Sequence, residues 1–217
     1  MKWSWTYLLV LIPEFTHWLE TGRLPGNLRE WISDLALSLI LLACAWIMIR
    51  QSRRLEKQAL IDPLTGLLNS RKLQQDLPDE ISRARRFGSP LALAYVDLDN
   101  IKGINDAHSH AIGDDVLRRF SELLRQTARR TDRCYRVGGD EFIVIMPGTA
   151  INGARELLDR LRSSALHGPV ELERYGASLS VGVVKLRDGE SPNDLLRRAD
   201  HLMYQSKNGG KNRITSM

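Results

Sequence analysis

The chain has 217 residues and carries 31 lysines and arginines against 26 aspartates and glutamates, a formal net charge of +5. Its two cysteines, Cys44 and Cys134, exclude a disulfide scaffold and a cysteine zinc site. A basic balance suits nucleic acid or an anionic membrane surface, but a cluster of cations between Arg50 and Lys57 directly follows an apolar run. This placement favours a membrane explanation, and no nucleic-acid partner is expected.

Two apolar segments lie at the beginning of the chain. Residues 31–49 carry one charge, Asp34, near their start, and about 20 apolar residues match the thickness of a bilayer. Residues 3–19 are apolar as far as Pro13, and either a signal peptide or a first membrane helix explains them. No small-residue cleavage site follows, which favours the helix. We therefore expect a transmembrane helical hairpin over residues 1–50.

The remainder of the chain is expected to form a helical linker and one domain. Residues 51–61 have high helix propensity, and the helix is expected to stop at Asp62 because proline follows it. Residues 62–217 alternate between helical and strand patterns, so an α/β (α+β) domain with a central sheet wrapped by helices is predicted. We expect strands over 91–97, 177–184 and 212–215, a hairpin over 134–146, and helices over 70–87, 112–127, 150–165 and 192–206.

The predicted hairpin carries two glycines and two acids at its turn, residues 138–141. Glycines there supply positive-φ turn geometry and admit a ligand close to the backbone. Two further acids, Asp97 and Asp99, end the first buried strand. If the two strands are neighbours, Asp97 and Asp140 share a divalent metal, and their oxygen ligands suit Mg²⁺. The plainer alternative is that carboxylates at strand ends are merely solvated.

Several stretches, in the same order along the chain, resemble the GGDEF family of diguanylate cyclases. They are residues 62–69, 97–114, 138–142 and 204–213, and the resemblance covers about 59–215. It implies a fold similar to nucleotide cyclases and polymerase palms, with a mostly antiparallel central sheet. It also implies that two GTP molecules are condensed to cyclic di-GMP with release of two pyrophosphates. Each subunit holds one GTP, so a homodimer is implied, anchored in the bacterial inner membrane with its catalytic domain in the cytoplasm.

The resemblance also implies roles for single residues. Asp97, the carbonyl of Leu98 and Asp140 would bind metal, with two Mg²⁺ or Mn²⁺ ions per half-site. Glu141 matches the second acid of the signature, which the family requires, and Lys102 would contact the β- and γ-phosphates.

Substrate recognition is implied in the same way. Two polar side chains would recognise guanine, two glycines would let the α-phosphate approach the backbone, and two lysines near the C-terminus would reach the phosphates. These residues are, in that order, Asn105, Asp114, Gly138, Gly139, Lys207 and Lys211.

A second site is implied by Arg129 and Asp132, which match the family's pattern for feedback inhibition by bound product. Arg160, on the next predicted helix, is a further candidate for it. An arginine and a carboxylate suit a guanine edge or a phosphate, although such a pair alone is usually an exposed helix end. Where the family usually has Arg, Phe and Tyr-Gly, this chain has Ser70, Ile101 and His108-Ser109, and Ser109 precedes the guanine contact expected at Asp114.

Three functions stay open at this point. The first is an active cyclase with product feedback. The second is a non-catalytic receptor that binds cyclic di-GMP at Arg129 and Asp132 and signals through the membrane hairpin. The third keeps the metal site but performs a different reaction, as a nuclease or another cyclase. The retained acids Asp140 and Glu141 favour the first, and Asn105 and Asp114 argue for guanine.

Overall fold

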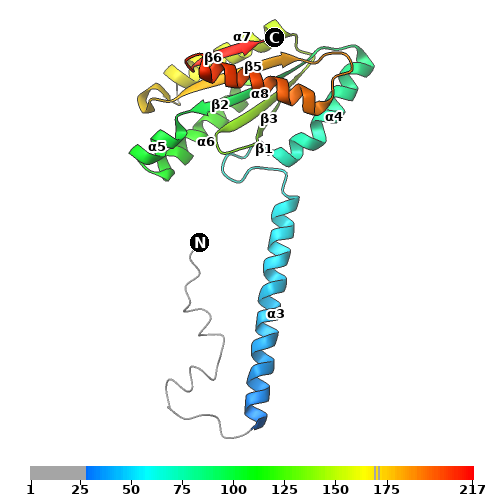
Figure 1. Ribbon diagram of the computed structural model, residues 1–217, viewed down its shortest axis with the longest axis vertical. Coiled ribbons are helices and arrows are strands. Elements are labelled where there is room, and N and C mark those ends of the chain that lie inside the picture. Colours follow the sequence, from blue (N-terminus) through cyan, green and yellow to red (C-terminus); the bar gives the residue numbers. More distant parts are fainter. Residues whose placement is uncertain (1–27, 169, 171) are drawn as a thin grey trace. The chain divides into compact units, whose positions relative to one another are not determined.

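The computed structural model describes residues 28–168, 170 and 172–217, and the chain divides into two compact units after Ala59 (Figure 1). The described part of the first unit forms the helix α3 (Leu28–Gln58). The helix extends through the residues of the predicted linker as far as Gln58. Among the residues described, no helix is both long enough and apolar enough to cross a membrane, so the span predicted at 31–49 is not found. The other predicted span, 3–19, lies outside the described residues.

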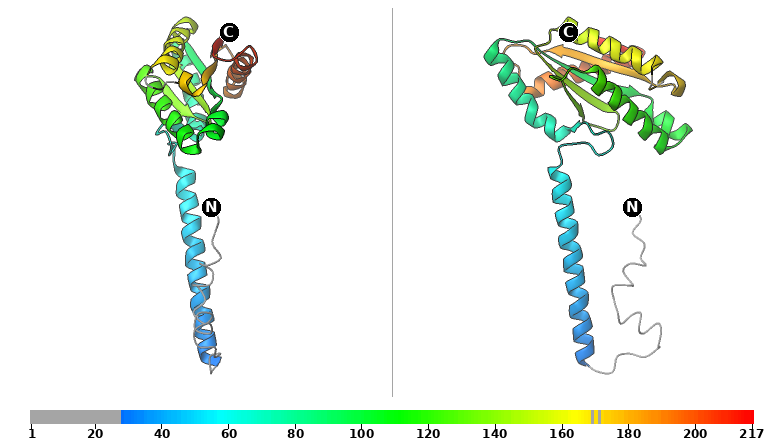
Figure 2. Two further views of the ribbon diagram at one scale, coloured as in Figure 1. Left: turned by 90° about the vertical axis from the view of Figure 1, so that its left-hand side faces the viewer. Right: turned by 180° about the vertical axis from the view of Figure 1, so that it is seen from behind.

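The second unit is a six-stranded sheet with helices on both faces (Figures 1 and 2). Its strands are β1 (Leu68–Asn69), β2 (Leu91–Asp99), β3 (Arg133–Arg136), β4 (Glu141–Pro147), β5 (Ser178–Lys185) and β6 (Arg213–Ser216). Its helices are α4 (Ser70–Phe87), α5 (Ile101–Ala107), α6 (His110–Thr127), α7 (Ile151–His167), the 3₁₀ turn η1 (Leu172–Tyr175) and α8 (Pro192–Asn208).

The sheet is mixed, which corrects the expectation of a mostly antiparallel one. Its strand order is β1-β3-β4-β2-β5-β6, with antiparallel pairs in the middle and a parallel pair at each edge, β1 with β3 and β5 with β6. For β5 and β6 the cause is simple: α8 joins them, and a helical crossover returns the next strand in the same direction. β1 reaches β3 by two such crossovers in succession, α4 to β2 and then α5 and α6 to β3, and each keeps the strand direction. Such a return is invisible in the periodicity of a strand of two or four residues.

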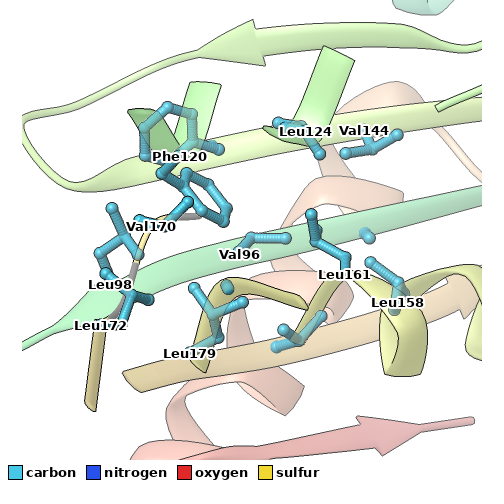
Figure 3. Packing of buried hydrophobic residues seen from close by; sticks show 14 of the residues in the cluster. Val96, Leu98, Phe120, Leu124, Val144, Leu158, Leu161, Val170, Leu172 and Leu179 are labelled. Atoms are coloured by element: carbon cyan, nitrogen blue, oxygen red, sulfur yellow. The ribbon is translucent and has the colours of Figure 1, made fainter. Parts of the chain in front are cut away.

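β2 is the central strand, and its side chains alternate between two hydrophobic layers. Val96 and Leu98 lie on the face covered by α6 and α7, in one cluster with Phe120 (Figure 3). The rings of Phe120 and Phe142 meet edge to face at 4.9 Å between their centroids. Leu93 and, half-buried, Tyr95 belong to the opposite face, covered by α4 and α8. Both faces of β2 are therefore buried, and only its C-terminal end is left for polar groups.

The helix predicted over 112–127 begins earlier, and a separate helix, α5, precedes it. The division falls at His108 and Ser109, where Ser109 is the N-cap of α6 and its Oγ accepts from the N–H of Ile112 at 3.4 Å. The φ of Ser109 is 177°, extended backbone that any residue adopts. The departure from glycine at this position is therefore accommodated by the fold, and it supplies a helix cap.

Candidate active site

Asp97 is the buried acid near the end of β2. Its side chain is only 3% exposed, and its Oδ2 lies 2.7 Å from the Nζ of Lys207 on α8. Its other oxygen, Oδ1, is buried with no hydrogen-bond partner among the described residues. A buried carboxylate oxygen without a partner is costly, so it marks a place where the protein favours a ligand over its own side chains.

The surroundings of Asp97 disfavour its charge. Burial raises the pKa of this carboxyl to about 6; the Lys207 ammonium opposes the rise, while the charges of Asp140 and Asp99 add to it. Burial alone would lower the pKa of Lys207, but the hydrogen bond to Asp97 and the field of the neighbouring acids raise it instead. Lys207 therefore stays charged and partly neutralises an acidic site that holds more negative than positive charge.

The hairpin brings the signature acids to Asp97. Glu141 is the direct partner of Asp97 in the antiparallel register of β2 and β4, and the N–H of Leu98 donates to the carbonyl of Asp140 at 3.0 Å. The described residues contain no ready cluster of three metal-ligating side chains. The partnerless Asp97 Oδ1 nevertheless fits a hard cation such as Mg²⁺, which takes one or two carboxylates and completes its shell with water and phosphate oxygens.

Gly138 and Gly139 do not have the positive-φ turn geometry predicted for them. Neither has a φ in the positive range, so the turn does not need glycine for its backbone conformation. A Cβ on Gly138 would lie 2.3 Å from Glu141 Oε2, whereas a Cβ on Gly139 would meet nothing within 4 Å. Gly138 is therefore required by the side chain of Glu141, and Gly139 leaves its side of the turn open.

Asp99, the second acid at the end of β2, is held internally. Its carboxylate accepts from Ser178 Oγ at 2.6 Å and from Ser180 Oγ at 2.9 Å, and it is 3% exposed. Both serines lie on β5, which pairs with β2. Of the two acids, Asp97 alone keeps an oxygen available.

The residues expected to contact guanine lie on α5 and α6. Asn105 Oδ1 is buried without a hydrogen-bond partner among the described residues, and a Cβ on Gly113 would lie 2.0 Å from it. Gly113 thus makes room for Asn105, one position before Asp114, a function that sequence reasoning did not assign. Lys102 is exposed on α5, at the same end of the sheet as Asp97.

The two C-terminal lysines separate in the structure. Lys207 reaches Asp97, while Lys211 is exposed, with a φ of 60°, in the turn after α8. α8 can approach the sheet because of Gly182 on β5, where a Cβ would lie 2.1 Å from the carbonyl oxygen of Ala199. Gly182 was not among the predicted site residues, and only its place within a strand would have drawn attention to it.

Arg136 was also missed by sequence reasoning. Its guanidinium donates to the carbonyl of Gly139 through Nε at 3.2 Å and Nη2 at 2.8 Å, and through Nη1 to Asp62 Oδ1 at 2.9 Å. Asp62 also accepts from the N–H and the hydroxyl of Thr65. Burial alone would raise the pKa of Asp62, but these hydrogen bonds and the charge of Arg136 lower it. One arginine thus joins the signature turn to the loop that begins the domain.

The predicted product site lies at a separate cavity of about 480 Å³. Arg129 and Asp132 line it and are joined by a backbone N–H to carboxylate hydrogen bond of 2.8 Å. Asp132 Oδ1 is buried without a partner among the described residues. Burial raises the pKa of Asp132, against the N–H and the charge of Arg129. Arg160, exposed on α7, is not one of the lining residues; Arg125 and Arg133 are.

The structure is that of an α/β domain with an acidic site at the end of its central strand and a separate cavity lined by arginines. Residues 59–213 match the family model described as the diguanylate cyclase GGDEF domain. The chain belongs to this family. Diguanylate cyclases of the family generally use divalent metal ions.

Relatives and solved structures agree with this assignment. The chain is 36% identical over 162 residues to the diguanylate cyclase DgcS of Shewanella oneidensis, covering 75% of this chain and 54% of that protein. It is 37% identical over 160 residues to the diguanylate cyclase DgcP of Pseudomonas aeruginosa, covering 73% and 24%. The crystal structure of the GGDEF domain of DgcB from Caulobacter crescentus in complex with c-di-GMP superposes with a TM-score of 0.67 at 30% identity, covering 73% and 95%. The chain therefore spans about half or less of the length of these two curated relatives.

Proposed function

We propose that this protein is a diguanylate cyclase that condenses two GTP molecules to cyclic di-GMP and two pyrophosphates. The observation that carries the proposal is Asp97, a buried carboxylate with one oxygen on Lys207 and the other without a partner, beside the acidic turn of the hairpin. Asp97, the carbonyl of Leu98 and Asp140 would hold Mg²⁺ or Mn²⁺, with two ions per half-site. These ions would neutralise charge on the transferred phosphoryl group.

The other site residues would bind and orient GTP. Asp114 would accept from the ring N–H and amino group of guanine, and Asn105 would contact the same base. Lys102, Lys207 and Lys211 would contact phosphates as point charges. In each half-reaction the 3′-hydroxyl of one GTP attacks the α-phosphate of the other; the phosphoanhydride bond breaks, pyrophosphate leaves and the hydroxyl proton is released. Because one chain holds one GTP, the reaction requires a homodimer.

Turnover by the purified full-length protein tests this function. Incubation with GTP and Mg²⁺ is expected to yield cyclic di-GMP and pyrophosphate in a ratio of one to two, measured by liquid chromatography, with a rate per chain that rises with protein concentration. ATP should not replace GTP. Absence of any cyclic dinucleotide at high protein concentration would overturn the proposal.

We further propose product feedback at the cavity lined by Arg129 and Asp132. An arginine and a carboxyl with a buried partnerless oxygen suit the donors and acceptors of a guanine base. Added cyclic di-GMP is expected to slow turnover, and Arg129→Ala is expected to relieve that inhibition without lowering the initial rate. The alternative function, a receptor of cyclic di-GMP, predicts binding at this cavity with no turnover of GTP.

An inner-membrane location with a cytoplasmic catalytic domain stays a prediction. It rests on the apolar composition of residues 3–19 and 31–49. Fractionation of cells that express the full chain tests it: recovery in the membrane pellet after a high-salt wash supports an integral anchor, and release by the wash contradicts one.

A further inference from the structure

The carboxylate of Glu141 accepts a hydrogen bond on one side and lies close to Gly138 on the other. The hydroxyl of Tyr95 donates to Glu141 Oε1 at 3.2 Å. On the other side, Oε2 occupies the space that a Cβ on Gly138 would need. Both contacts come from residues outside the two acids of the signature, and Tyr95 lies on a different strand. Glu141 is therefore the signature acid whose orientation depends on a neighbour in β2.

The sheet places Tyr95 where it can control this orientation. Along a strand, side chains two residues apart share a face, so Tyr95 lies on the same face of β2 as Asp97. Glu141 is the register partner of Asp97 on β4, and Ile143 is the register partner of Tyr95. The hydrogen bond from Tyr95 to Glu141 is therefore a diagonal across two strands, and it ends beside the acid with the partnerless oxygen.

The ring of Tyr95 is fixed by packing, so its hydroxyl has a defined position. The ring packs against the buried cluster beneath α4 and α8. Its register partner on β5 is Gly182, the residue that lets α8 approach the sheet closely. A rigid donor on a strand holds a carboxylate with little loss of side-chain freedom, which is how neighbouring residues keep catalytic groups in place.

We propose that Tyr95 is a positioning residue for Glu141: its hydroxyl holds Oε1, on the face of the sheet that carries Asp97, while Gly138 leaves room for Oε2. The 3.2 Å distance is longer than the 2.7–2.8 Å usual for hydroxyl donors, and hydrogen bonds at reaction sites commonly shorten when substrate binds. The inference rests on the proposed function, since it concerns the second signature acid of the same site.

The test is Tyr95→Phe in the full-length protein, which removes the hydroxyl and keeps the ring. The kcat for GTP is expected to fall about tenfold with KM within about twofold, because the loss affects the orientation of an acid rather than nucleotide binding. The affinity for Mn²⁺ alone, measured by electron paramagnetic resonance without nucleotide, is expected to fall at least about threefold as Glu141 turns away from Asp97.

Tyr135→Phe is the matched control. Tyr135 is a buried tyrosine on β3 of the same sheet and lies outside the site. Its hydroxyl donates to Asp76 at 2.9 Å. It is expected to lower the melting temperature while leaving kcat and Mn²⁺ affinity unchanged. Equal losses in both variants, or kcat and Mn²⁺ affinity unchanged in Tyr95→Phe, would overturn the inference. If the wild type turns over no GTP, the proposed function fails, and Mn²⁺ affinity still decides the role of Tyr95.

Discussion

Two acids of this domain, Asp76 and Asp97, are both buried but differ in how many hydrogen-bond partners surround them. Asp76 on α4 accepts from Lys72 at 2.8 Å, from Tyr135 at 2.9 Å and from Arg133 at 3.0 Å. Asp97 on β2 has Lys207 on one oxygen and nothing on the other. The first acid is saturated by the protein, and the second is left short of one partner.

The pKa values follow this difference. Burial alone would raise the pKa of Asp76, but its hydrogen bonds to Lys72 and Tyr135 and the nearby positive charges lower it. For Asp97 burial prevails, and the pKa rises to about 6. The carboxylate of Asp76 therefore stabilises the fold, whereas that of Asp97 costs stability. An acid kept at a cost to stability, beside an acidic turn, is what a ligand site requires.

The largest expected effect comes from Asp97→Asn, which keeps the shape of the side chain and removes its charge. Cyclase activity is expected to fall at least about 100-fold, because the group that would hold the cation is lost. The free energy of unfolding, in contrast, should rise in this variant at neutral pH. The folded pKa lies above the unfolded value of 3.8, so the free energy of unfolding falls as pH rises from about 4 to about 6.

Above pH 7 the variant should consequently be more stable than the wild type, by at most about 3 kcal/mol. Urea unfolding at pH 4.5 and pH 7.5 in the presence of a chelator measures this difference. A variant that is less stable than the wild type at pH 7.5 would show that Asp97 is a structural acid like Asp76.

Asp76→Asn is the reciprocal change, with an expected cost of about 2 kcal/mol at pH 7, because the partly exposed Lys72 and Arg133 lose a charged hydrogen-bond acceptor. The folded pKa of Asp76 is depressed, so its contribution is present above the unfolded value of 3.8 and is lost as pH falls below it. Thermal unfolding at pH 7 and pH 3 measures the loss. The specific activity of the folded fraction should match the wild type, and a selective loss of activity would contradict a purely structural role.

Alanine substitutions at the two glycines of the turn are expected to have smaller effects on kcat, and to differ from each other. Gly138→Ala is expected to lower kcat about tenfold, since the new methyl group takes the space of Glu141 Oε2. Gly139→Ala introduces a methyl group that meets nothing within 4 Å and should lower kcat less than threefold. Steady-state kinetics compares the pair. Equal losses would indicate instead that substrate approaches both glycines, as the family resemblance implies.

The sequence predicted the central elements of the domain well. The helix over 70–87 is α4, and the hairpin around 134–146 is β3 and β4 within one residue at each end. Strong periodicity and punctuation by glycine and proline mark these segments. The proximity of Asp97 to the hairpin was predicted on the condition that the two strands are neighbours, and the pairing of β2 with β4 meets that condition.

Other features could not be predicted because they depend on contacts between distant segments. The parallel pair of β5 and β6 depends on the path of α8, and that of β1 and β3 depends on two crossovers with β2 between them. The break before α6 depends on one serine cap. Ser180 and Asp99 are 81 positions apart, and no local pattern indicates that β5 supplies the donors for that acid. The same holds for Arg136 and Asp62. The residue types of the site were predictable from the sequence, whereas the hydrogen-bond partners of each carboxylate oxygen were not.

The link from Arg136 to Asp62 has a consequence for where the domain can be cut. Its acidic turn is tied to a residue eight positions before α4, ahead of the first strand. A fragment that starts at α4 would keep every signature residue and lose the anchor of the turn. The smallest fragment that keeps this anchor therefore begins before Asp62. A fusion partner joined after Asp62 would alter the reaction centre without changing any signature residue.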